Sequence, residues 1–126
     1  MYNKYGNRKT QTPDGEVFDS NKEAKRWTIL KLLEGAGEIT DLRRQVKYDL
    51  IPPQYEGVPK YTKSGQRIKD KLVLVEREVS YIADFVYFDK RLNQTIVEDV
   101  KGMKTKEYVI KRKLMLYFHG IRITEV

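Results

Sequence analysis

The segment from Tyr81 to Phe88 places the strongest constraint on the fold of this chain. It reads Tyr-Ile-Ala-Asp-Phe-Val-Tyr-Phe, which is typical of a β-strand with apolar residues on both faces. Because strand side chains alternate between faces, Asp84 shares a face with Ile82 and Val86 and lies where a core residue is expected. An unpaired carboxylate in such a position is costly. We therefore expect another group to compensate the charge of Asp84.

A following strand, expected from Thr95 to Lys101, contains the residues that would meet Asp84. If the two strands form a hairpin that turns near residues 91 and 92, Asp84 lies directly opposite Asp99. Facing carboxylates repel each other, and a divalent cation such as Mg²⁺ removes this conflict because it prefers carboxylate oxygens as ligands. Lys101 shares the face of Asp99 and is suited to position or deprotonate a water molecule, or to stabilise developing phosphate charge. The pattern indicates metal-dependent hydrolysis.

Two alternatives to this interpretation remain open. The first is that Asp84 forms only a structural ion pair with Lys101. The second is that Glu98, and not Asp99, is the functional acid of the second strand. Glu98 points to the other face and has Val100 where the lysine should be, so strand parity favours Asp99.

A third acid, Glu23, is expected on a helix that begins at Ser20. Ser20 and Glu23 have the spacing of a capping box, in which the glutamate caps the first turn. Trp27 and Leu30 follow four and seven residues later, so Glu23 also lies on the stripe that faces the sheet. Capping alone and a role in the site are both consistent with this position.

The remaining pattern predicts an α/β fold with a mixed central sheet flanked by helices, in the order helix, strand, strand, strand, helix, strand. We expect one domain over residues 1–126, with a polar N-terminal arm (1–17) that contains the turn Pro13-Asp14-Gly15. Residues 39–50 read as the first core strand, and residues 51–71 as a basic, irregular insertion broken by proline and glycine. A second helix is expected over residues 106–118 and a final short strand over 121–126. The apolar face of the second helix is expected to consist of Val109, Ile110, Leu114, Tyr117 and Phe118.

Composition narrows the classes of function. The chain has 25 Lys and Arg against 18 Asp and Glu, a net charge of +7, which suits a polyanionic partner or an inert basic surface equally well. It has no cysteine and one histidine, which excludes thiolate zinc sites and histidine-rich metal sites. No apolar run reaches membrane length and the N-terminus lacks the apolar core of a signal peptide, so we expect no membrane contact and a cytoplasmic location.

The acidic residues and the lysine resemble the motif of the PD-(D/E)XK nuclease superfamily, which has the restriction-endonuclease-like fold. Asp84 matches the acid on one strand, Asp99-Val100-Lys101 the acid-x-Lys of the next, and Glu23 the acid from the preceding helix. The expected order of elements is similar to the αβββαβ core of that superfamily, so the resemblance covers residues 18–126. The amino-acid sequence around these motifs is similar to that of small phage and prophage proteins. The expected location of a phage-encoded protein is the host cytoplasm. Gln45 resembles a glutamine sometimes found on the first core strand, and Ala83 stands where the motif has proline.

This resemblance implies a Mg²⁺- or Mn²⁺-dependent DNA endonuclease that hydrolyses phosphodiester bonds, with branched or junction DNA as a plausible substrate. Asp84, Asp99 and Glu23 would hold the metal, and Lys101 and Gln45 would complete the catalytic set. A homodimer is expected if both DNA strands are cut. Basic residues near these positions are the expected DNA contacts: Lys22, Lys25, Arg26, Lys60, Lys63, Arg67, Lys104 and Lys106. The alternatives are a non-catalytic DNA-binding or recombination accessory module, which would bind DNA without metal, and an RNA-directed nuclease.

Overall fold

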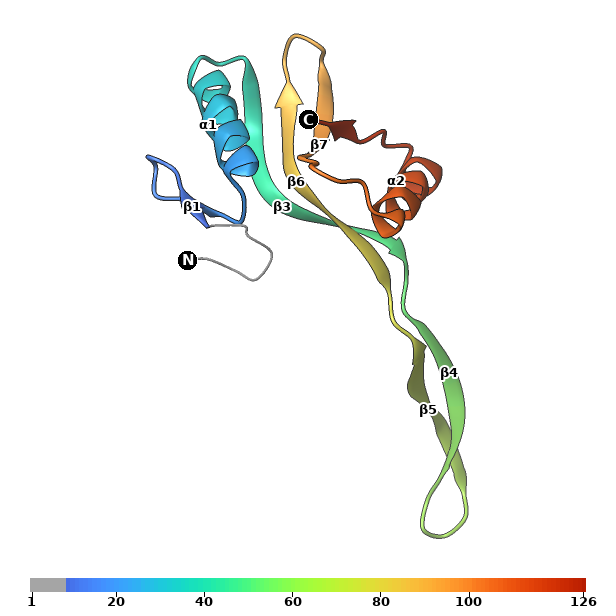
Figure 1. Ribbon diagram of the computed structural model, residues 1–126. Coiled ribbons are helices and arrows are strands. Elements are labelled where there is room, and N and C mark those ends of the chain that lie inside the picture. The colour runs from blue at the N-terminus through green and yellow to red at the C-terminus, as the bar shows by residue number, and fades with distance from the viewer. Residues whose placement is uncertain (1–8) are drawn as a thin grey trace.

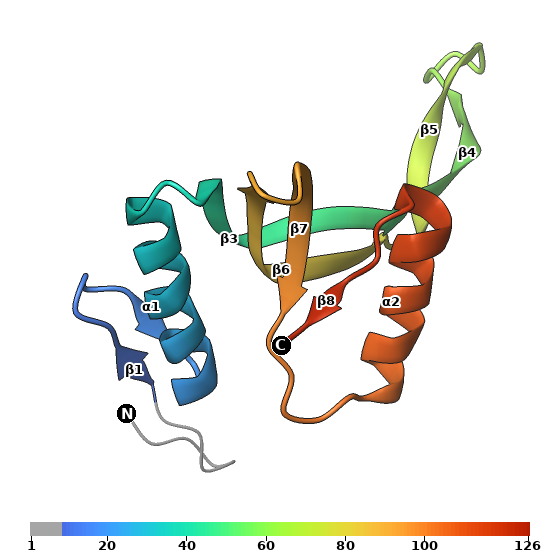
Figure 2. The same ribbon diagram turned by 90° about the horizontal axis from the view of Figure 1, so that it is seen from above.

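The computed structural model describes residues 9–126 and has a mixed α/β architecture (Figure 1). A four-stranded sheet has the order β3-β6-β7-β8, in which β3, β6 and β7 are antiparallel and β8 runs parallel to β7. The two helices lie at opposite sides of this sheet (Figure 2), each over its own hydrophobic cluster. The elements of this core are α1 (Asn21–Gly35), β3 (Ile39–Ile51), β6 (Val79–Asp89), β7 (Gln94–Asp99), α2 (Lys106–His119) and β8 (Thr124–Glu125). Their order is the expected helix, strand, strand, strand, helix, strand.

The N-terminal segment is partly ordered by a small hairpin. β1 (Thr10–Gln11) pairs with β2 (Val17–Phe18) around the expected turn at Pro13-Asp14-Gly15. Phe18 is buried against Trp27, and the Trp27 indole N–H donates to Asp14 at 2.8 Å. The polar N-terminal segment expected over residues 1–17 is thus structured from Thr10 onwards, and its first eight residues lie outside the described part.

The faces of β6 exchange at Asp84. Tyr81 and Ala83 lie in the cluster under α2, whereas Phe85 and Tyr87 lie in the cluster under α1, although all four have the same parity. In the neighbouring strand β3, the pairs Arg44↔Phe85 and Val46↔Ala83 place Gln45 level with Asp84, and Gln45 has a φ of 55°. A non-glycine residue in this left-handed region is uncommon within a strand. The backbone distortion and the change of faces therefore coincide with the predicted acidic position.

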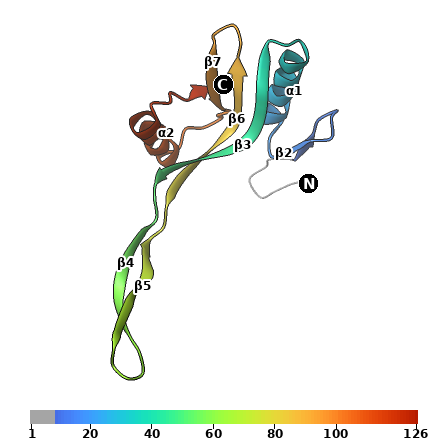
Figure 3. The same cartoon turned by 180° about the vertical axis from the view of Figure 1, so that it is seen from behind.

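The expectation of an irregular insertion over residues 51–71 is wrong. This part of the chain belongs to a second hairpin, which we call the arm: β4 (Gln54–Tyr61) pairs with β5 (Arg67–Glu76) and projects away from the core sheet (Figures 1 and 3). Pro59 does not break β4, because it lies at a register shift between Val58 and Lys60 where no ladder bond is required of it. The arm leads directly into the core sheet, since β5 ends at Glu76 and β6 begins at Val79.

Helix α2 presents a different face from the one that we expected. Tyr108 and Met115 are buried, and Val109 and Leu114 pack beside them. Ile110, Tyr117 and Phe118 are exposed instead, Tyr117 by 81%. Of the helices within residues 9–126, none is long and apolar enough to cross a membrane.

Candidate active site

The β6–β7 hairpin has the predicted register. Pairs run from Asp89↔Gln94 to Phe85↔Glu98, so Asp84 and Asp99 are the next residues to face each other. The ladder stops here because the backbone N–H of Val100 donates to the Asp84 carboxylate at 2.8 Å instead of continuing the strand pairing. Strand β7 consequently ends at Asp99, before the expected end at Lys101. Asp84 and Asp99 line the same cavity of about 310 Å³, together with Lys101.

The Asp99 carboxylate is buried and only half satisfied. The Tyr81 hydroxyl donates to Oδ2 at 2.5 Å. Oδ1 accepts no hydrogen bond within residues 9–126, although the Lys101 Nζ lies 3.1 Å away. We attribute this to the direction of approach, which provides charge contact without hydrogen-bond geometry. One buried oxygen of Asp99 is thus available to a further partner that carries positive charge.

The Asp84 carboxyl is destabilised in its charged form. Burial raises its pKa, the Val100 N–H opposes this, and the negative charges of Asp99 and Glu23 raise it further, to about 7. A bound cation would relieve the repulsion that the Asp84 carboxylate meets here.

Lys101 is held from several directions. Its Nζ lies 4.1 Å from the centre of the Tyr108 ring, and its backbone N–H donates to the carbonyl of Val126 at 3.2 Å. The Lys22 Nζ donates to the Lys101 carbonyl at 2.6 Å. The ion pair of Lys101 is made with Asp99, so the alternative of a structural pair between Lys101 and Asp84 is not what the structure shows.

Glu23 lies at the start of α1, and its negative charge is felt by Asp84. Ser20 is the N-cap and accepts from the Glu23 N–H at 3.2 Å, as predicted. The reciprocal bond of a capping box is absent, since within residues 9–126 the Glu23 carboxylate accepts no hydrogen bond. Burial raises the pKa of Glu23, as does the charge of Asp19, while Arg44 lowers it and Asp99 raises it. Capping therefore does not engage this carboxylate.

Glu98 is confirmed on the opposite face from Asp99, and it has a structural partner there. It is fully buried, and the Arg26 guanidinium donates to its two oxygens at 2.8 and 2.5 Å. The Tyr87 hydroxyl also donates to Glu98. The charge of Arg26 thus neutralises a buried carboxylate under α1, and its predicted contact with DNA stays a prediction.

Gln45 is close to the site in the sheet but does not enter it. It lies level with Asp84, yet its side chain is exposed. At this position the structure shows a distorted backbone. Within residues 9–126, no hydrogen bond of the Gln45 side chain supports its predicted catalytic role.

The other predicted DNA contacts fall into two groups. Lys22, Lys25, Lys104 and Lys106 are exposed on the core; Lys22 reaches Lys101 of the site, whereas Lys25 borders the N-terminal hairpin. Within this group, Lys104 pairs with Glu125 at 3.1 Å. Lys60, Lys63 and Arg67 lie on the arm, remote from the site, and Arg67 pairs with Asp70 at 3.1 Å (Figure 1).

Sequence reasoning missed two tyrosines and a glutamate that support the site. Tyr81 donates to Asp99, and Tyr108 lies under Lys101 and donates to Glu125 at 2.7 Å. Burial and the bond to Asp99 raise the pKa of Tyr81 far above its ordinary value, so its hydroxyl remains a donor. The parity of Tyr81 was a signal that placed it in the core, but only packing shows which acid it meets.

The donor set suits a hard divalent cation, although it is incomplete by itself. Asp84 and Asp99 supply carboxylate oxygens, one of them buried without a hydrogen bond. In the described part of the chain, no three Asp, Glu, His or Cys side chains converge closely enough to hold an ion. Glu23 thus acts on the aspartates through its charge, and the remaining ligands of such an ion would be water or substrate oxygens.

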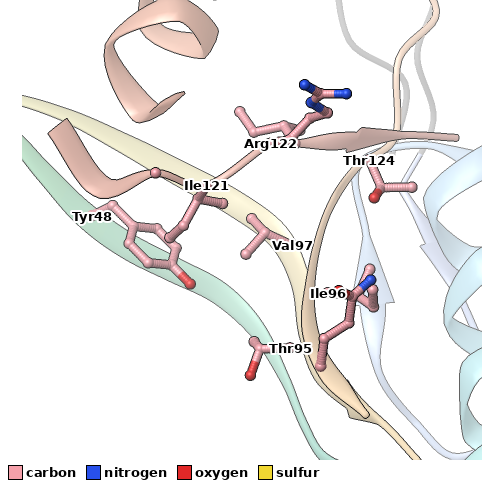
Figure 4. A pocket seen from close by; sticks show the side chains of 10 residues that line it. Tyr48, Thr95, Ile96, Val97, Ile121, Arg122 and Thr124 are labelled. Carbon is pink, nitrogen blue, oxygen red and sulfur yellow. The ribbon is translucent and has the colours of Figure 1, made fainter. Parts of the chain in front are cut away.

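A cavity larger than that of the two aspartates lies elsewhere. It measures about 640 Å³ and is bordered by Tyr48 of β3, Val97 of β7 and the segment from Gly120 to Thr124 (Figure 4). Arg122 is the one charged residue that lines it. The smaller cavity is the candidate site, since it is lined by Asp84, Asp99 and Lys101.

Comparison with known proteins assigns the chain to a family. The family described as "Protein of unknown function (DUF1064)" matches residues 2–125, and the chain belongs to it. No curated protein and no solved structure matches the chain.

Proposed function

We propose that this protein is a metal-dependent DNA endonuclease whose site consists of Asp84, Asp99, Lys101 and Glu23. The observation that carries the proposal is the meeting of Asp84 and Asp99 at the end of a hairpin, where burial and mutual repulsion raise the pKa of Asp84 to about 7. Crowded acids beside a restrained lysine are costly to a fold that does not use them. The resemblance to the PD-(D/E)XK motif supports the same assignment.

Asp84 and Asp99 would hold Mg²⁺, with Glu23 nearby through a water molecule. When bound, the ion would lower the pKa of a water molecule and offset charge on the phosphate. The Val100 N–H fixes the orientation of Asp84, and Tyr81 fixes that of Asp99. Lys101, restrained by the Tyr108 ring and two backbone bonds, would stabilise phosphate charge or hold the proton of the attacking water.

The surface around the site suits a phosphate backbone. Lys22 and Lys106 are exposed, and Lys22 and Lys101 come from different elements that meet here. Contacts of this kind are independent of base sequence. We therefore expect affinity that falls steeply with salt and a substrate chosen by shape.

The test is cleavage of junction, flap and linear DNA in Mg²⁺, with RNA of the same sequences for comparison. Asp84→Asn, Asp99→Asn and Lys101→Ala should each lower the rate by roughly two to four orders of magnitude. The controls Asp49→Asn and Lys113→Ala change exposed residues outside the site and should retain the wild-type rate. Equal activity in site variants and controls would remove the assignment. Salt-sensitive DNA binding without cleavage by any form would instead identify a non-catalytic accessory module.

A further inference from the structure

The arm is a hairpin that has no partner within the described chain. β4 and β5 form a separate two-stranded sheet and pair only with each other among the strands of residues 9–126. Every residue of both strands is exposed. A two-stranded hairpin is marginally stable in water, which makes an uncovered arm of this length an unfavourable final state.

The arm carries more apolar surface than a free hairpin requires. Tyr55, Leu72 and Leu74 share one face, since Tyr55 pairs with Leu74 and Leu72 pairs with Gly57. Eight large apolar side chains of the arm are exposed by 37–69%: Tyr55, Val58, Tyr61, Ile68, Leu72, Val73, Leu74 and Val75. Both faces of the ribbon carry such residues, since Leu72 and Leu74 alternate with Val73 and Val75 along β5. A twisted ribbon that coils around this one would contact residues of both faces.

Charge is segregated along the arm. The tip, residues 60–69, contains Lys60, Lys63, Arg67 and Lys69 and no acidic residue. The stem, residues 54–59 with 70–76, contains Glu56, Asp70 and Glu76 against a single Lys71. Two arms side by side in the same direction would therefore bring two cationic tips together, whereas two arms in opposite directions would place each tip beside an acidic stem.

We propose that the arm is a dimerisation element and that its occupant is the arm of a second copy of this chain, packed antiparallel around a twofold axis. Such pairing covers the exposed apolar residues and matches tip with stem. It leaves the acidic site free, because the arm projects away from the core that carries this site (Figures 1 and 3). The proposal is independent of the nuclease assignment, since it depends on no residue of that site.

The first test is the mass of the 126-residue chain by light scattering and sedimentation at about 100 µM, above the µM dissociation constants of weak interfaces. We expect a dimer for the wild type and a monomer for the variant Leu72→Lys with Leu74→Lys, with the dissociation constant raised more than tenfold. Leu32→Lys on α1 is the matched control, because Leu32 is exposed by 70% and Leu72 by 69%, and it should remain dimeric. Circular dichroism should show unchanged folding in all three. A monomeric wild type, or a dimer that survives both stem substitutions, would overturn the proposal.

The second test reads the direction of the pairing and uses the absence of cysteine from the sequence. The tip variant Lys63→Cys and the stem variant Glu76→Cys are mixed, left to exchange subunits and then treated with oxidised glutathione as the oxidant. The mixed disulfide should form at least tenfold faster than the disulfide of Lys63→Cys with itself. Introducing Leu72→Lys and Leu74→Lys into both should abolish this difference. Faster tip-to-tip disulfides would contradict the antiparallel arrangement. Stem substitutions that reduce only DNA binding, while the mass stays monomeric throughout, would assign the arm to nucleic acid instead.

Discussion

At the scale of single residues, the acids of this chain differ in what satisfies them. Glu98 is fully buried but accepts from an arginine and a tyrosine. Asp99, by contrast, has an oxygen that accepts no hydrogen bond from residues 9–126, and the charge of Asp84 is disfavoured by its acidic neighbours. A buried carboxylate with a bidentate partner is structural in character, and one that is left partly unsatisfied is a candidate for chemistry. This difference distinguishes Glu98 from Asp99, although the two are adjacent residues of β7.

The raised pKa of Asp84 predicts a pH-dependent stability for the metal-free protein. The ordinary pKa is 3.8 and the folded value is about 7, so the folded state holds a proton that the unfolded state has already lost at intermediate pH. The stabilisation is complete below pH 3.8 and is lost as pH rises through about 7. Asp84→Asn imitates the protonated form and should therefore be more stable than wild type at pH 8, by about 1–2 kcal/mol after solvent screening.

Thermal unfolding in EDTA across the range from acid to pH 8 measures this effect. The gap in Tm between Asp84→Asn and wild type should widen towards alkaline pH and close towards acid. Glu38→Gln, which removes one carboxylate at an exposed position, is the control for net charge. A difference in Tm that stays constant with pH would contradict the destabilisation of the charged Asp84 carboxylate in the folded protein.

Removing Arg26 should be far more damaging than its position on a surface helix suggests. Arg26→Ala leaves Glu98 buried without its cation, and breaking a buried pair from one side costs about 3–5 kcal/mol. The neighbouring Lys25→Ala removes an exposed cation and should cost less than about 0.5 kcal/mol. Urea unfolding of both variants compares them directly, and similar midpoints would contradict the structural role of Arg26.

At the scale of elements, helix α2 shows how an apolar pattern can mislead. Tyr108 and Met115, seven residues apart, face the sheet, while Tyr117 and Phe118 face outwards. Tyr108 reaches Glu125 with its hydroxyl and supports Lys101 with its ring, so the helix is rotated to place a polar tip in the site.

The orientation of α2 gives a prediction that distinguishes the two faces. Met115 is fully buried, and Met115→Ala should lower the free energy of unfolding by about 2–5 kcal/mol through loss of packing and a cavity. Tyr117→Ala removes a larger side chain but should change the free energy of unfolding by less than about 0.5 kcal/mol, because Tyr117 is exposed. Chemical denaturation of the two variants measures these free energies. A greater loss of stability for Tyr117→Ala would indicate that the face expected from the sequence is the buried one.

At the scale of the whole molecule, the site joins segments from both ends of the chain. Glu23 and Lys22 come from α1, Asp84 from β6, Asp99 from β7 and Tyr108 from α2. A ligand that binds several of these segments in the folded protein alone must stabilise the whole domain.

Magnesium should therefore raise the thermal stability of this protein. At free Mg²⁺ about 100-fold above Kd, mass action adds about 2.7 kcal/mol, which corresponds to roughly 10 °C in Tm for a domain of this size. Asp84→Asn with Asp99→Asn should abolish the increase, and Lys113→Ala should preserve it. Scanning fluorimetry with Mg²⁺ against equal ionic strength of Na⁺ provides the measurement. An equal response in the double variant would place any ion elsewhere.

The sequence by itself determined the local relationships of this protein. The register of Asp84 with Asp99 follows from a short turn and strict strand alternation, and the cap at Ser20 follows from spacing in the first helical turn. Only the tertiary structure decided which partner each side chain meets: Arg26 with Glu98, Tyr81 with Asp99, and residues 54–76 as a free hairpin. The physical reason is range. Backbone geometry sets relationships over a few residues, whereas burial and pairing depend on segments that are distant in the chain and meet only when the sheet and its two helices are packed.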